Sequence, residues 1–241
     1  MRILLIRPIV SEVPDSVVER EVAGLSRVGL SIEARRLNTG PPAVEDHVTA
    51  TEAARGVVEL ARAAEAEGYD AAAIYCFADP GLEAARQTVR IPVAGAGESS
   101  ILIASSLGTT FSVVTVVDGL VSTIYNTVSR LSLGGRLASI RSVGIPVLEL
   151  GDAARLEAAL QREAVKAVEE DGAHVVVLGC TGMTGAAADL RSFLEDRGFR
   201  IPVVDPAQAC VKWAEMLAGL GLTHSAKTYP LVRNTVSSRG G

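Results

Sequence analysis

Short apolar runs alternate with longer amphipathic stretches along the whole chain. The runs contain almost no polar positions, which is typical of parallel strands buried on both faces. The stretches between them carry apolar residues at helical spacing, and one ends at Gly68, a common helix stop. We expect strands over 2–7, 30–37, 71–75, 112–117, 138–143 and 173–178, and helices over 14–28, 51–67, 80–89, 119–132, 152–170, 184–197 and 206–219.

This alternation predicts an α/β fold with parallel sheets, and the two halves of the chain resemble each other. Gly68 lies eight residues before Cys76, and Gly172 lies eight residues before Cys180. The tetrapeptide Arg-Ile-Pro-Val then follows in each half, at 90–93 and 200–203. We therefore expect two similar Rossmann-like (flavodoxin-like) lobes related by a pseudo-two-fold axis, with the active site in the cleft between them. Residues 1–96 and 206–241 would form lobe 1, and residues 97–205 lobe 2.

Composition narrows the class of protein. Of the 241 residues 48% are apolar and only 4% aromatic, so the core must consist of Ala, Val, Leu and Ile. The net charge is −5 and no Lys/Arg cluster stands out, which argues against a nucleic-acid partner. No apolar stretch reaches the roughly 18 residues that span a bilayer, and the N-terminal run lacks a signal-peptide cleavage site. We expect a cytoplasmic protein without a membrane partner, and the apolar content predicts a homo-oligomer.

Three cysteines carry the candidate chemistry. With no C-x-x-C pair and only scattered histidines, neither a disulfide framework nor a metal site is expected. Cys76 and Cys180 follow equivalent strands, and ligands of open α/β sheets bind beyond the carboxyl ends of strands. A two-fold axis would place one thiol on each side of a bound molecule. Cys210 lies within a helical pattern and is expected to be structural.

Opposed thiols suit inversion at a carbon centre. One group removes a proton from one face, and the second delivers a proton to the other face. Both cysteines precede expected helices, whose N-termini favour thiolate, so we expect lowered thiol pKa values. The backbone N–H groups of residues 77–79 and 181–183 are candidate substrate anchors.

The motifs around these cysteines resemble those of a known family. Residues 76–82, CFADPGL, and residues 178–183, LGCTGM, resemble the hydantoin and allantoin racemases of the aspartate/glutamate racemase superfamily over nearly the whole chain. The resemblance implies a two-thiol mechanism without a cofactor, with Cys76 and Cys180 as the catalytic pair, acting on a 5-substituted hydantoin or allantoin. Expected substrate-binding residues are Pro8, Ile9, Phe77, Ala78, Asp79, Gly97, Glu98, Ser99, Thr115, Val116, Thr181 and Gly182.

One loop departs from the family pattern. Residues 7–10 read Arg-Pro-Ile-Val, where the family has Asn-Pro-Asn-Thr or a similar sequence. The loss of polar groups suggests a hydantoin with a bulky apolar substituent, or another cyclic amide such as a diketopiperazine. Thr181 is either a hydroxyl donor or a helix N-cap, and Glu98 either a pocket residue or the first-turn acid of a helix. Asp79 also fits a turn or cap.

Other classes of protein share part of this pattern. A related decarboxylase needs only one thiol, and a cis–trans isomerase fits the context of Cys76 less well. A non-catalytic two-lobed binding protein has no reason to place two thiols at equivalent strand ends. The glycines at 95 and 97 lack the third glycine of a dinucleotide fingerprint. We expect His174 to be structural. The Pro-rich stretch 39–47, which contains His47, fits a surface loop, or else a mobile loop near the cleft.

Overall fold

The computed structural model describes residues 1–10, 18–19, 22–26, 28–183 and 185–232. Within these ranges the chain forms two four-stranded parallel sheets. The first contains β1 (Arg2–Arg7), β2 (Ser31–Arg36), β3 (Ala71–Ile74) and β4 (Val93–Gly95), and the second contains β5 (Phe111–Thr115), β6 (Leu137–Ser142), β7 (Val176–Leu178) and β8 (Val203–Val204). Their strand orders, β2-β1-β3-β4 and β6-β5-β7-β8, repeat one topology. The predicted α/β fold with two similar parallel-sheet halves is confirmed.

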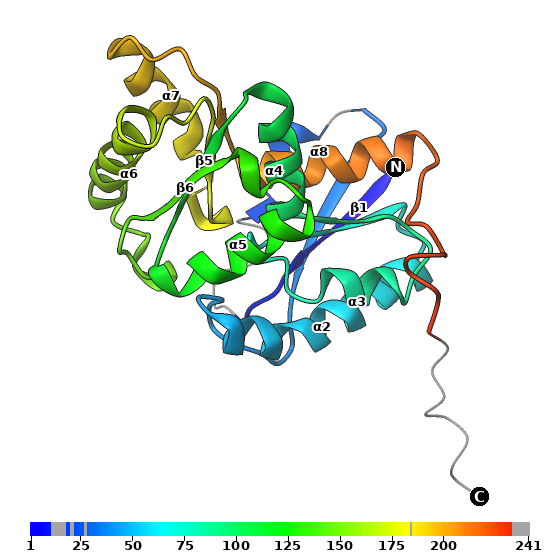
Figure 1. Ribbon diagram of the computed structural model, residues 1–241. Coiled ribbons are helices and arrows are strands. Elements are labelled where there is room, and N and C mark those ends of the chain that lie inside the picture. The colour runs from blue at the N-terminus through cyan, green and yellow to red at the C-terminus, as the bar shows by residue number, and fades with distance from the viewer. Residues whose placement is uncertain (11–17, 20–21, 27, 184, 233–241) are drawn as a thin grey trace, which may run out of the picture.

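Helices cover the sheets, and Figure 1 shows the two halves side by side with α4 between them. The helices are α2 (His47–Ala66), α3 (Leu82–Arg86), α4 (Ala96–Leu107), α5 (Val121–Arg130), α6 (Ala153–Glu169), α7 (Ala186–Asp196) and α8 (Pro206–Gly219). Short 3-10 segments lie at Ala23–Leu25, Asp118–Leu120, Gly134–Arg136, Val147–Glu149 and Thr181–Met183.

The first sheet explains why its strands lack polar positions. In β1, Ile3 and Leu5 pack with α8 on one face, whereas Leu4 and Ile6 pack with α2 on the other. Side chains of a strand alternate between faces, so a strand with helices on both sides must be apolar throughout. Because α8 packs here, the last helix of the described chain completes the first half. The expected boundaries, 1–96 with 206–241 and 97–205, stay a prediction.

Several element boundaries differ from the predicted ones. Helix α2 begins at His47 instead of residue 51, because Asp46 and Thr49 form a capping box. The helix predicted over 80–89 is only α3, Leu82–Arg86. Strands β4 and β8 were not among the predicted elements, since they are only two or three residues long. Helix α4 was not among them either. Of the helix predicted over 14–28, residues 14–17, 20–21 and 27 lie outside the described residues, and Ala23–Leu25 is a 3-10 turn.

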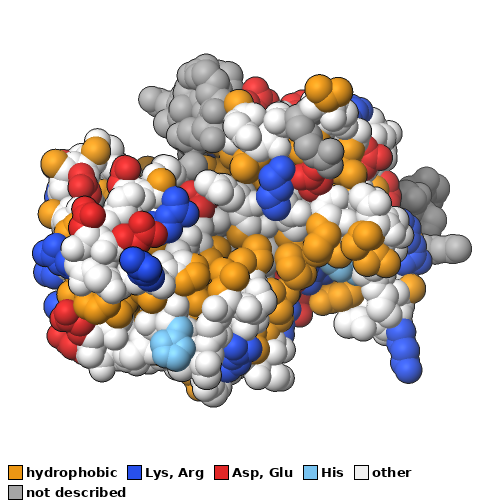
Figure 2. Space-filling view, turned by 90° about the horizontal axis from the view of Figure 1, so that it is seen from above, with side chains coloured by type: hydrophobic (Ala, Val, Ile, Leu, Met, Phe, Trp, Pro, Cys, Tyr) orange, Lys and Arg blue, Asp and Glu red, His pale blue; other side chains and the backbone are white. Residues whose placement is uncertain are grey.

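Two surface properties bear on partners. Among the described residues, no helix is both long and apolar enough to cross a membrane. Seen from above, apolar side chains gather across the middle of the molecule (Figure 2). Large exposed apolar side chains include Leu107 in α4, Tyr125 in α5 and Met216 in α8. The homo-oligomer stays a prediction.

Candidate active site

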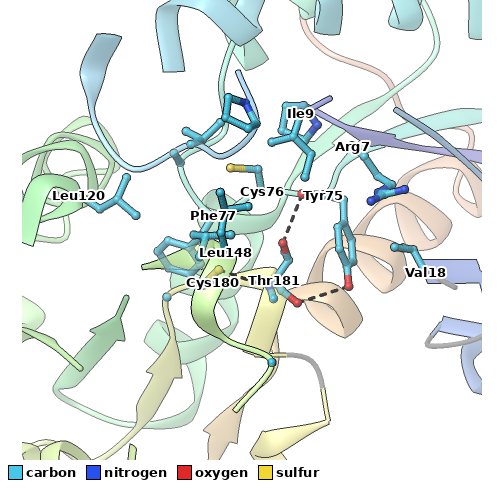
Figure 3. Close-up of a pocket in the computed structure, with 18 residues that line it drawn as sticks. Arg7, Ile9, Val18, Tyr75, Cys76, Phe77, Leu120, Leu148, Cys180 and Thr181 are labelled. Atoms are coloured by element: carbon cyan, nitrogen blue, oxygen red, sulfur yellow. Dashed lines mark hydrogen bonds between the residues drawn. The ribbon is translucent and has the colours of Figure 1, made fainter. Parts of the chain in front are cut away.

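One cavity of about 400 Å³ lies where the carboxyl ends of the two sheets meet. Cys76 comes from the loop after β3 and Cys180 from the loop after β7 (Figure 3). The cysteines therefore reach one space from equivalent positions in the two halves. The cavity is lined by Arg7, Pro8, Ile9, Val18, Pro42, Val44, Tyr75, Cys76, Phe77, Ala78, Leu120, Val147, Leu148, Gly151, Gly179, Cys180, Thr181 and Gly182.

A tight turn sets the position of Cys76. The backbone N–H of Asp79 donates to the carbonyl of Cys76 at 3.0 Å, and Asp79 itself has a φ of 48°. Its carboxylate accepts the N–H groups of Gly97 at 3.0 Å and Glu98 at 2.7 Å, in the first turn of α4. A Cβ at Gly97 would lie 2.1 Å from the Phe77 carbonyl oxygen. The Cys76 loop is thus held directly against α4.

The loop that carries Cys180 is anchored to β5. The N–H of Gly179 donates to the carbonyl of Val114 at 2.8 Å, and the hydroxyl of Thr115 donates to the carbonyl of Gly179 at 3.2 Å. After the cysteine, Thr181–Met183 forms a single 3-10 turn. Within it the N–H of Gly182 points at the Cys180 sulfur, at 3.3 Å.

The thiol pKa values differ from the expected direction. Burial raises the pKa of Cys76 well above its ordinary value and that of Cys180 to about 11. The N–H groups of Ala78 and Gly182 oppose this rise at Cys76 and Cys180 respectively, without cancelling it. The expectation of lowered values relied on helix N-termini. However, Cys76 lies six residues before the short helix α3, and Cys180 is followed only by a 3-10 turn.

Eight of the predicted site residues line the cavity, namely Pro8, Ile9, Cys76, Phe77, Ala78, Cys180, Thr181 and Gly182. The other six do not. Asp79 and Gly97 join the Cys76 loop to α4, as described above. Thr115 lies beneath the Cys180 loop, and Val116 is buried in the core of the second half. The hydroxyl of Ser99, in the first turn of α4, donates to the carbonyl of Gly95 at the end of β4, at 2.7 Å.

Glu98 is held in a buried ion pair away from the cavity. Its carboxylate accepts from Arg86 at 2.6 and 3.1 Å and from Arg130 at 2.9 Å. Side-chain exposure is 4% for Arg86 and 9% for Glu98. Burial alone would raise the pKa of Glu98, but the hydrogen bonds from the two arginines hold this pKa below its ordinary value. Of the two predicted roles, the position in the first turn of α4 is the one observed.

The remaining cysteine and histidines lie outside the cavity. Cys210 is fully buried in α8, where its sulfur approaches the carbonyl of Ile74 at 3.5 Å. His174 is exposed at the end opposite the cysteine on the β7 segment. His47 begins α2 and contacts the hydroxyl of Ser122 in α5 at 2.9 Å. Among the described residues no cluster of three or more His, Cys, Asp or Glu side chains could hold a metal ion.

Sequence reasoning did not identify ten of the lining residues as site residues. Most of them lie in the loops that follow β2, β3, β5, β6 and β7. The rule that ligands bind at the carboxyl ends of parallel strands could have found them, had it been applied to every strand. The loop over 39–47 illustrates this, because Pro42 and Val44 line the cavity. The neighbouring Glu45 carboxylate accepts the N–H of Val147, in the second half, at 2.5 Å.

Comparisons with known proteins agree with this architecture. The model of the Asp/Glu/Hydantoin racemase family matches residues 3–214. The hydantoin racemase of Pseudomonas sp. (strain NS671) is 35% identical over 232 residues, covering 95% of this chain and 91% of that protein. The hydantoin racemase of Paenarthrobacter aurescens is 34% identical over 233 residues, covering 95% and 96% respectively. The solved allantoin racemase from Klebsiella pneumoniae superposes with a TM-score of 0.89 at 31% identity, covering 97% of this chain and 94% of that one.

Proposed function

The chain belongs to the Asp/Glu/hydantoin racemase family and is an isomerase, and from this premise we propose that it racemises a cyclic amide by two-cysteine proton transfer. The preferred substrate is a 5-substituted hydantoin with an apolar substituent. One observation carries the proposal. Cys76 and Cys180, at the ends of equivalent strands of two repeated halves, line a single cavity.

The substrate class follows from the chemistry of the carbon acid. The reacting carbon of a hydantoin is flanked by a carbonyl and a nitrogen, so its carbanion is stabilised as an enolate. One thiolate removes the proton from this carbon, and the electron pair of the C–H bond moves onto the carbonyl oxygen. The opposite thiol then delivers its proton to the other face. After the turnover the first cysteine is a thiol and the second a thiolate, so the pair is ready for the reverse reaction.

The pKa values shape how the thiolate forms. Since burial raises both thiol pKa values, the thiolate is scarce at neutral pH and proton removal becomes faster as pH rises. The N–H groups of Ala78 and Gly182 stabilise whichever sulfur is ionised. A two-base reaction needs one thiol and one thiolate, so its rate falls again when both ionise.

The cavity lining favours an apolar substituent. Ile9, Val44, Leu120 and Leu148 contribute aliphatic side chains to it, and such a wall gains more from a buried hydrocarbon than from a polar group. Allantoin carries a polar ureido substituent, whereas 5-benzylhydantoin carries an aromatic one. A diketopiperazine with apolar side chains is the second candidate, because it presents the same carbon between a carbonyl and an amide nitrogen.

The test incubates one enantiomer of 5-benzylhydantoin with the protein in D₂O, and follows optical rotation and deuterium content together. We expect loss of rotation with deuterium incorporation, abolished in Cys76→Ser and in Cys180→Ser. Cys210→Ser is the matched control, because it changes the third cysteine, which lies outside the cavity, and should racemise normally.

Two outcomes would contradict the proposal. Exchange without racemisation in the wild type would mean that one thiol acts alone, and racemisation that survives in either cavity variant would exclude the two-thiol mechanism. If 5-benzylhydantoin is inert, allantoin and then a cyclic dipeptide decide whether the substrate ring or the racemase chemistry is wrong.

A further inference from the structure

A reciprocal pair of hydrogen bonds joins the two halves beside the cysteines. The phenol of Tyr75 donates to the carbonyl of Thr181 at 3.3 Å. In return, the hydroxyl of Thr181 donates to the carbonyl of Tyr75, also at 3.3 Å. Both bonds are buried, and both are visible in Figure 3. The side chain and the backbone of each residue thus contact those of the other.

These two residues are the immediate neighbours of the thiols. Tyr75 precedes Cys76, and Thr181 follows Cys180. The Tyr75 end is anchored to the first sheet, since its N–H donates to the carbonyl of Ile6 at 2.8 Å. The Thr181 end is anchored to the second sheet through Gly179, whose bonds to β5 are described above. The pair therefore connects one sheet to the other within one residue of each sulfur.

The repeat makes this link one-sided. In the second half the position equivalent to Tyr75 is Gly179, and in the first half the position equivalent to Thr181 is Phe77. Neither has a side-chain hydroxyl, so the pseudo-symmetric counterpart of this link cannot form. A link that only one side of a repeated scaffold carries is not a by-product of the repeat.

We propose that Tyr75 and Thr181 are positioning residues that fix the separation of the Cys76 and Cys180 sulfurs. The inference rests on the proposed function and deepens it. Inversion requires the second thiol to be within reach of the carbanion at the moment the first has taken the proton. If the separation varies, the carbanion is reprotonated from the face it came from. When the first thiol has meanwhile exchanged with solvent, the product contains deuterium but keeps its configuration.

The experiment measures deuterium incorporation relative to inversion, with one enantiomer of 5-benzylhydantoin in D₂O. Tyr75→Phe and Thr181→Val each remove one of the two hydrogen bonds, and the double variant removes both. We expect the ratio to rise about fivefold for each lost hydrogen bond, with kcat falling more than KM rises. Thr181→Ser keeps the hydroxyl and should restore the wild-type ratio. Tyr125→Phe, at a tyrosine that is 55% exposed in α5, is the matched control.

The readout separates positioning from folding. A residue that only stabilises the fold lowers exchange and inversion together, so an unchanged ratio in soluble, folded variants overturns the inference and leaves the two-thiol mechanism intact. A ratio that rises equally in Tyr125→Phe overturns it as well. Failure of the wild type to exchange or racemise any of the three ring classes overturns the proposed function, and the inference with it.

Discussion

Replacing Glu98 with glutamine tests whether this residue stabilises the fold or contacts the substrate. The change keeps the size of the side chain and removes its charge. Arg86 retains its two bonds to the carbonyl of Val93, at 3.1 and 3.0 Å. Its guanidinium therefore stays in place, 4% exposed, but loses its closest counter-ion. Arg130 is about one-third exposed, at 32%, so water can compensate for most of what it loses.

The magnitude follows from the burial of the pair. Removing one partner of a buried ion pair destabilises a protein by about 3–5 kcal/mol, because the remaining charge is left uncompensated. For a chain of this size each kcal/mol lowers Tm by about 2–4 °C. We therefore expect Glu98→Gln to lower Tm by roughly 6–20 °C. The KM for substrate should stay unchanged below the transition, because Glu98 does not line the cavity.

The assay monitors thermal unfolding by circular dichroism. Steady-state racemisation is measured in parallel, at a temperature about 20 °C below the lower of the two Tm values. Glu59→Gln is the matched control. It removes the same group from a pair with Arg55 of similar length, 2.9 Å, in which the side chains are 89% and 60% exposed. Such pairs contribute little to stability. If Tm falls equally little in both variants, the stability reasoning is refuted. If Glu98→Gln instead raises KM at unchanged Tm, Glu98 contacts substrate.

Three further perturbations probe the site and its supports. Burial is the main cause of the raised Cys180 pKa and the Glu45 charge adds to it, so Glu45→Gln should lower the pH midpoint of Cys180 alkylation. Gly97→Ala places a methyl group 2.1 Å from the Phe77 carbonyl oxygen, which must displace the Cys76 loop and should slow racemisation about a hundredfold. Burial lowers the pKa of His224 from 6.5 to about 4. The unfolded chain then binds a proton first, so stability is lost as pH falls from 6.5 towards 4, and Tm should fall less in His224→Gln than in the wild type.

Each of these has a control and a contrary result. Glu52→Gln removes an exposed charge from α2. An equal change in the pH midpoint of Cys180 alkylation in this variant would mean that Glu45 has no specific effect. Gly134→Ala adds a methyl group with no atom within 4 Å, so it should leave the rate unchanged. A wild-type rate in Gly97→Ala would show that the Cys76 loop moves to accommodate the methyl group without loss of activity. His174→Gln, at an exposed site, should leave the acid-side fall in Tm as it is; if His224→Gln does the same, His224 does not cause that fall.

The fold could be predicted because its strands and helices have strong local patterns. A parallel strand between two helical layers must be apolar throughout, as β1 is, and a long amphipathic helix such as α6 has an unmistakable period. The repeat then indicated two similar halves. Strand β8 has only two residues, too few for any periodicity. Helix α4 carries apolar and small residues on several sides because it lies between the halves, so no single apolar stripe marks it.

The site was predictable only as far as the chain signals it locally. Cys76 and Cys180 were found because the repeat marks both positions. Leu148 comes from a loop with no motif, and only tertiary structure brings it to the cavity. Glu98 shows the opposite error, since a carboxylate near the end of a strand suggests a pocket. Its partner Arg86 lies twelve residues earlier in the chain, so the sequence alone does not reveal the pairing.

The return of α8 to the first sheet has a consequence for the order of assembly on the ribosome. The face of that sheet formed by residues such as Ile3, Leu5 and Ala73 packs against Cys210 and Ala214 of α8. This face stays uncovered until residues 206–219 have been synthesised, whereas the second half already has all of its strands by then. A Cβ on Gly219, the last residue of α8, would lie 3.7 Å from the Met1 side chain. A circular permutant that starts with α8 and continues through a short linker into β1 would reverse this order, and the first half would close before the second emerges.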